Sequence, residues 1–127
     1  MIRRTNELSS INSPKIVKEI DFKTALSIFV DDCEIRNLRR QTIQLQKWII
    51  EFYKIIREKE FNPAPTNITK DQIKNIILHM KEKGLQTVSI NTRLRAIRAF
   101  FNFLHHERHI KENPLNDIKR LDIPLQN

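Results

Sequence analysis

Apolar residues recur along the chain at intervals of three and four, which is the spacing of one face of an α-helix. A first pattern covers residues 21–37, where Asp21 is placed to cap the helix start, and a second covers residues 40–58. The inward positions of these two patterns are Phe22, Leu26, Phe29, Val30 and Cys33, and then Leu45, Trp48, Ile49, Phe52, Ile55 and Ile56. The sequence therefore predicts two amphipathic helices joined by a short polar turn.

A loop that contains two prolines separates this pair from two further helical patterns. The third pattern begins at Thr69, which forms a capping box with Gln72, and ends at Gly84, a residue suited to a left-handed terminator. The fourth pattern covers residues 88–108. The inward positions are Ile73, Ile76, Ile77 and Met80, and then Ile90, Leu94, Ile97, Phe101 and Leu104.

The packed domain is expected to occupy the middle of the chain. Residues 1–20 are polar and predict a flexible N-terminal arm, and residues 116–127, which follow the break at Asn113-Pro114, predict a linker. Residues 21–115 then form one compact all-α domain of four helices. Glycine occurs once in 127 residues, which is too seldom for an all-β fold or a phosphate-binding loop.

Charge narrows the classes of partner. Lys and Arg total 23 against 15 Asp and Glu, a formal charge of +8 that favours a polyanion such as nucleic acid. No apolar run approaches the roughly 18 residues of a membrane span, so no membrane partner is expected. The single cysteine, Cys33, has no partner for an internal disulfide and indicates a reducing compartment. Without an export signal, we expect a cytoplasmic protein.

One sector of the fourth pattern groups side chains that suit DNA. At about 100° per residue, Asn91, Arg95, Arg98 and Asn102 fall close together beside the apolar stripe, and we expect them on the outside. Arginine reads guanine edges and binds phosphate, and asparagine suits adenine edges. The sector contains no acid that would neutralise the arginines. A solvated charged face without a ligand is the alternative.

The second pattern adds cations near its start. Arg39 and Arg40 lie at that start, and the hydroxyl of Thr42 is placed to reach a phosphate together with free helix N–H groups. Lys47 falls opposite the buried stripe, although glutamates near this face weaken the signal. The full set of expected DNA-contact residues is Arg39, Arg40, Thr42, Lys47, Ser89, Asn91, Arg95, Arg98 and Asn102.

Residues that would carry catalysis are sparse. His105 and His109 share a helix face at a spacing found in metal sites, but histidines near a helix C-terminus also suit the helix dipole, and we expect no metal. No nucleotide-binding loop is present in the sequence, and no cofactor is expected. Tyr53, the single tyrosine, falls within the second helix and is not a candidate nucleophile. We therefore expect no catalytic residues in this chain.

The stretch from Leu85 to Pro114 resembles the last helix of the core-binding, SAM-like domain of tyrosine recombinases and phage integrases. The matching residues are Ser89, Ile90, Asn91, Ala96, Ile97, Arg98, Phe100, Phe101, Asn113 and Pro114. The run Gln41-Thr42-Ile43, followed by Trp48 and Phe52, is similar to the family's second helix. Two departures are Ser89, where threonine is more usual, and His109, where glycine often closes the fourth helix.

The resemblance implies half of a clamp around duplex DNA, whose second and fourth helices meet the major groove of a recombination half-site. It also implies a parent protein of Xer-like layout that serves DNA recombination or integration. A catalytic domain would then begin after Asn127, and sister recombinase protomers on the DNA would be further partners. Two alternatives stay open. One is a helix-turn-helix transcriptional regulator, and the other is a helical protein-interaction module without a role on nucleic acid.

Overall fold

The computed structural model describes residues 19–119, and its regular structure within them is helical. The elements in chain order are α2 (Phe22–Ile35), α3 (Arg39–Glu58), a 3₁₀ turn (Pro65–Asn67), α4 (Lys70–Glu82) and α5 (Thr87–His106). The prediction of an all-α domain with four helices is confirmed. None of the described helices has both the length and the apolar character that a membrane span requires.

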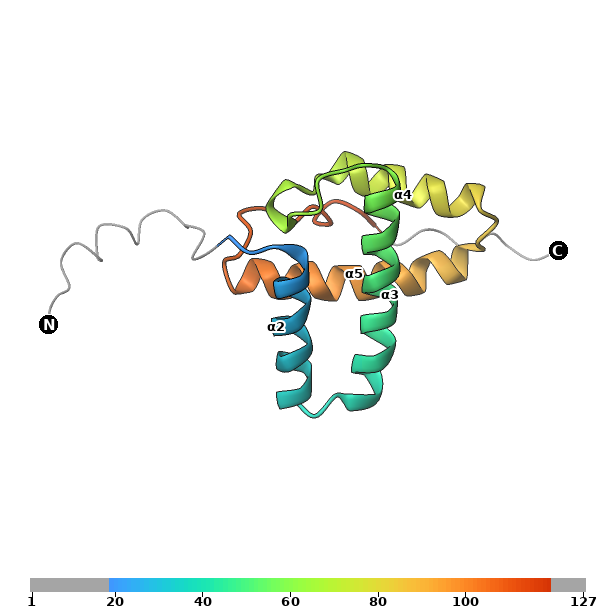
Figure 1. Cartoon of the computed structure of the whole chain (residues 1–127). Coiled ribbons are helices and arrows are strands. Elements are labelled where there is room, and N and C mark those ends of the chain that lie inside the picture. Colours follow the sequence, from blue (N-terminus) through green and yellow to red (C-terminus); the bar gives the residue numbers. More distant parts are fainter. Residues whose placement is uncertain (1–18, 120–127) are drawn as a thin grey trace, which may run out of the picture.

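The helices pack as a hairpin across a central helix. α2 and α3 run side by side in opposite directions, and α5 crosses both of them (Figure 1). α4 lies along α5 on the side away from the turn that joins α2 to α3 (Figure 1). Helix α5 contacts each of the other three helices, so the domain is built around it.

Local signals set the helix ends. The Asp21 carboxylate accepts a hydrogen bond from the Thr24 backbone N–H at 2.8 Å, which caps α2 as predicted and lowers the pKa of that carboxyl. The reciprocal capping box of Thr69 and Gln72 is present, and Gly84 has a φ of 90°. α2 ends before the predicted position 37 because Asn37 adopts a φ of 65°, outside the helical region.

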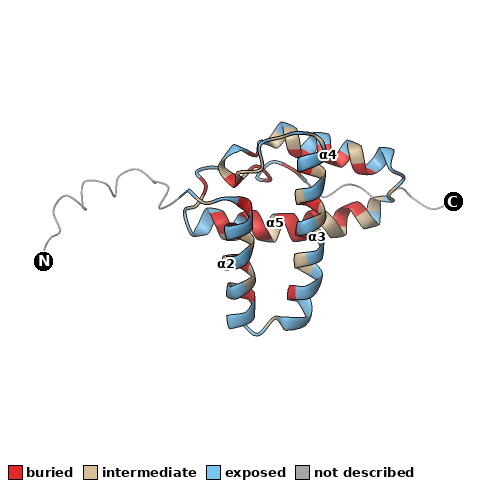
Figure 2. Cartoon of the chain, in the orientation of Figure 1, coloured by how far each residue is buried: buried red, intermediate tan, exposed pale blue. Residues whose placement is uncertain are grey.

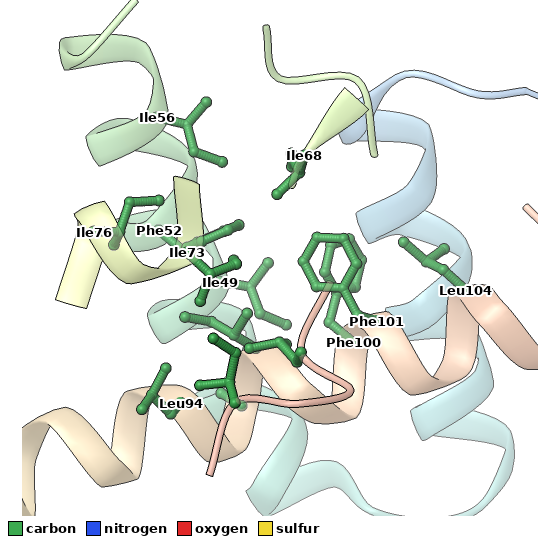
Figure 3. Packing of buried hydrophobic residues seen from close by; sticks show 14 of the residues in the cluster. Ile49, Phe52, Ile56, Ile68, Ile73, Ile76, Leu94, Phe100, Phe101 and Leu104 are labelled. Carbon is green, nitrogen blue, oxygen red and sulfur yellow. The ribbon is translucent and has the colours of Figure 1, made fainter. Parts of the chain in front are cut away.

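The core lies where the four helices meet, and aromatic side chains join α2, α3 and α5. The Phe100 ring on α5 lies 5.3 Å from the Phe22 ring and 5.5 Å from the Phe29 ring, centroid to centroid. Phe101 makes a similar contact with Phe52 of α3 at 6.1 Å. Figure 3 shows Phe52, Phe100 and Phe101 together with isoleucines from α3 and α4. Every inward position predicted for α4 and α5 is buried, and red positions line the facing sides of the helices in Figure 2.

Core packing includes residues on both sides of the predicted end of the domain at residue 115. Leu115 and Ile118 are both buried in the core cluster. Leu115 is the last residue of the predicted domain, and Ile118, which falls in the predicted linker, packs against the same helices. The predicted flexible arm lies outside the described residues except at its last two positions, where Ile20 packs against the core.

Candidate nucleic-acid interface

The outward side of α3 carries a mixed basic and apolar surface. Its exposed residues are Arg40, Ile43, Lys47, Ile50 and Lys54, which we call the α3 outer face. These five positions fall within a sector of about 80° when successive residues are about 100° apart on the helix. Four of them line a shallow depression that also includes Gln46, Trp48 and Glu51. A sector of this width is available to a ligand along the whole length of the helix.

The acids near this face are turned toward other helices. Glu51 Oε1 lies 2.6 Å from Arg93 Nε of α5. Glu58 lies 3.8 Å from His79 of α4, a contact that carries opposite charges only when the histidine is protonated. Among residues 19–119, no acid forms an ion pair with the three cations of the α3 outer face. Glu51 borders the depression, but its carboxylate is paired with Arg93, so the three cations of the α3 outer face keep no ion-pair partner among the described acids.

Arg93 joins α3 to α5, and sequence reasoning did not select it. Its guanidinium carbon lies 4.1 Å from the centroid of the Trp48 ring, and its Nη1 donates to the Ser89 carbonyl at 3.1 Å. The Lys47 ammonium lies 4.9 Å from the same ring centroid. An arginine at the edge of the apolar stripe of a helix faces the neighbouring helix. This position is the sequence feature from which the contact of Arg93 with α3 could have been predicted. Arg93 thus fixes the α3 outer face relative to α5.

We expect that replacing Arg93 by alanine lowers the free energy of unfolding by about 1 to 2 kcal/mol, because a half-buried ion pair and a cation–π contact are both lost. Glu51 is 41% exposed, and solvent screening keeps this value small. Urea denaturation measures this loss of unfolding free energy. In a double-mutant cycle, Glu51→Gln should cost much less in the Arg93→Ala background than in the original chain. Additive losses would mean that the two side chains act independently.

The predicted sector of α5 is only partly exposed. Arg95 is exposed, and no described acid pairs with it. Asn91 is only 7% exposed, so the prediction that the whole sector lies on the outside is wrong for this residue. The Arg98 Nη2 donates to the Ile118 carbonyl at 2.7 Å, and Asn102 Oδ1 accepts from Asn113 at 2.7 Å. These last two residues hold the segment after α5 against the helix.

The start of α3 also differs in part from the expectation. Arg39 and Arg40 are exposed, as a phosphate contact requires. Thr42 is 3% exposed, and its hydroxyl donates to the Leu38 carbonyl at 2.7 Å. The expectation that this hydroxyl faces a phosphate is wrong for the described structure, because the side chain is enclosed between α2 and α3. Ser89 is half-buried at the start of α5.

The histidines and the cysteine have plain structural surroundings. His105 and His106 are exposed, and the part of the chain that the structure describes contains no cluster of three or more side chains that would hold a metal ion. Cys33 is 1% exposed on the inner side of α2, as its core position predicted, and burial raises the pKa of its thiol. Tyr53 packs against Phe22 with ring centroids 4.7 Å apart, and its hydroxyl accepts from Arg57.

Comparison with known proteins decides the family. Residues 34–108, which include α3, α4 and α5, match the family model described as the phage integrase, N-terminal SAM-like domain. The chain belongs to this family. This match confirms the family resemblance that the sequence analysis found in the fourth helix. The order of the helices agrees with a SAM-like domain. No solved structure matches the chain significantly.

Three relatives of this SAM-like domain have names that agree with the family. The chain is 30% identical over 106 residues to the ICEBs1 integrase of Bacillus subtilis, a match that covers 84% of this chain and 28% of the relative. It is 28% identical over 86 residues to the tyrosine recombinase XerD of Rickettsia bellii, covering 68% of this chain and 27% of that protein. The SPbeta prophage-derived probable integrase/recombinase YopP of Bacillus subtilis is 25% identical, and 62% of this chain and 24% of that protein are covered. The chain therefore spans about a quarter of the length of the relatives it matches.

Proposed function

We propose that this chain is the DNA-binding module of a tyrosine site-specific recombinase or integrase. It holds duplex DNA at the major groove of a recombination half-site, and a catalytic domain of the same protein carries out strand exchange together with sister protomers. The observation that carries the proposal is the α3 outer face, where three cations have no described acidic partner because Glu51 and Glu58 face other helices. Membership of the phage integrase family supports the same ligand.

The dimensions of a helix suit this role. The major groove of B-DNA is about 12 Å wide and admits one α-helix. Cations on an inserted helix reach the phosphates on both sides of the groove, and phosphate contacts supply most of the affinity. Of the residues predicted from the sequence, Arg39, Arg40, Lys47 and Arg95 contact DNA directly in this proposal, since all four are exposed, and Lys54 of the α3 outer face joins them.

The remaining predicted residues act in support of those contacts. Thr42 closes the start of α3 through the Leu38 carbonyl. Arg98 and Asn102 keep the segment after α5 in place through Ile118 and Asn113. Asn91 is buried in α5, and the Ser89 carbonyl accepts from Arg93, the residue that pairs with Glu51 of α3.

The test is the salt dependence of binding to duplex DNA. Each phosphate contact adds about 0.9 to the negative slope of log affinity against log salt concentration. Three or four contacts therefore predict a loss of about 40- to 150-fold between about 50 and 200 mM salt. Fluorescence anisotropy with a labelled duplex measures this directly. Absence of binding at every salt concentration would favour the protein-interaction alternative, and tight binding to a palindrome by a stable dimer would favour the regulator.

A further inference from the structure

Two isoleucines stand exposed between the cations of the α3 outer face. Ile43 is 67% exposed and Ile50 is 37% exposed. They lie seven positions apart on one side of α3, separated by Lys47. The other exposed large apolar residues, Ile35, Leu78 and Val88, lie on α2, α4 and α5, one to each helix. The paired placement on a basic face therefore suggests a ligand that offers both negative charge and apolar groups.

We propose that Ile43 and Ile50 contact the C5-methyl groups of thymine in the major groove and give this domain a preference for A·T base pairs. The inference rests on the proposed function and specifies which bases the α3 outer face reads. The thymine methyl is the apolar group that the major groove displays, and aliphatic side chains are its ordinary partners. Lys47, Lys54 and Arg40 reach the flanking phosphates in this arrangement.

The spacing of the two isoleucines fits successive base pairs. Seven residues of α-helix correspond to about 10 Å along the axis. One strand of B-DNA advances about 3.4 Å per base, so this separation corresponds to about three base pairs. A helix lying along the groove would therefore place each isoleucine over a different base pair. Lys47, between them, would stay beside the phosphate backbone.

Charge complementarity favours DNA over a protein partner. Protein–protein interfaces are depleted of lysine at their centres, because burying an unpaired ammonium is costly. Here Lys47 and Lys54 alternate with the isoleucines, and no described acid pairs with either lysine. A DNA groove accepts this alternation, since its floor carries methyl groups and its walls carry phosphates.

The test compares two duplexes that differ only in the methyl group. The 127-residue chain is titrated at low salt against an alternating A·T duplex and the same duplex with deoxyuridine in place of thymidine. We expect about tenfold weaker binding to the uracil duplex, because each covered methyl group contributes about threefold to fourfold. The double variant Ile43→Ala/Ile50→Ala should bind both duplexes equally. Ile35→Ala, an exposed isoleucine beside acids at the end of α2, is the matched control and should keep the full discrimination.

Each outcome decides between the explanations. Methyl contacts are supported if the double variant alone no longer distinguishes the thymine duplex from the uracil duplex. A difference in stiffness between the duplexes affects both proteins equally, so it cancels when both proteins are compared on both duplexes. Equal discrimination by the original chain and the double variant overturns the inference but leaves DNA binding intact. Failure of the original chain to bind either duplex overturns the proposed function itself. A change of sedimentation in the double variant without a change in DNA affinity identifies a second copy as the occupant and overturns the inference. Circular dichroism checks that alanine, a strong helix former, preserves α3.

Discussion

Replacing Arg40, Lys47 and Lys54 together by glutamine should weaken the binding of duplex DNA about a hundredfold at low salt. Each side chain is exposed on the α3 outer face, and each cation lost from a phosphate contact costs about 1 kcal/mol or more. The slope of log affinity against log salt concentration should fall by about three, one unit for each phosphate contact removed. Anisotropy titrations at several salt concentrations give both quantities from one variant.

A charge-matched control separates a local contact from the field of the whole domain. Lys74, Lys81 and Lys83 are exposed on α4 and at its end, and their replacement by glutamine removes the same charge. At 0.1 M salt, exposed charges farther apart than about 10 Å are screened, so at that concentration this control should lose less than about threefold in affinity. Equal losses for the two triple variants would contradict an interface on α3 and would leave only a general attraction to polyanions.

Loss of folding is the competing explanation for weak binding by the α3 variant. The three side chains are exposed, and glutamine has nearly the same helix propensity as lysine and arginine. Thermal unfolding of both triple variants should therefore stay close to that of the original chain. A large drop in the unfolding temperature of the α3 variant alone would show that these residues stabilise the fold and would remove the support for a contact.

The helices could be predicted from the sequence because their signals are local. The inward positions of α4 and α5 repeat at helical spacing, and all of them are buried. The capping box at Thr69 and the left-handed Gly84 also depend on neighbouring residues alone. The end of the domain was harder to place, because Ile118 is buried in a core formed by residues distant in the sequence, and its carbonyl accepts from Arg98 twenty positions away.

The candidate site could be predicted only in part, for the same physical reason. Periodicity gives the angle of a side chain on its own helix but does not show which neighbour covers it. Asn91 shares a sector with Arg95, yet the first is buried and the second is exposed. The pair Arg93–Glu51 joins residues 42 positions apart, so no local pattern reveals it. Lys47 and Arg40 were selected correctly as exposed cations, because α3 turns one broad side to solvent.

The second large effect concerns the aromatic core that holds α5 against α2 and α3. Replacing Phe100 by alanine should lower the free energy of unfolding by about 3 to 5 kcal/mol, as a fully buried ring is lost and a cavity remains. Phe100 is 0% exposed and contacts Phe22 and Phe29 of α2, as well as Phe101 beside it. The loss is a large part of the total stability of a domain of this size, which is about 5 to 15 kcal/mol. Urea denaturation followed by circular dichroism measures the change.

Phe103 provides the comparison within the same helix. It is half-buried and contacts Phe29 with ring centroids 5.5 Å apart, so Phe103→Ala should cost clearly less than Phe100→Ala. Phe100→Leu, which keeps most of the buried volume, should also be milder. Equal losses of unfolding free energy for Phe100→Ala and Phe103→Ala would show that the core is not centred on Phe100. If the α3 outer face needs its fixed position against α5, the Phe100→Ala variant should bind DNA normally at low temperature. On warming, it should lose DNA binding as it unfolds, at a lower temperature than the original chain. Retained binding after that transition would mean that α3 contacts DNA without the support of the core.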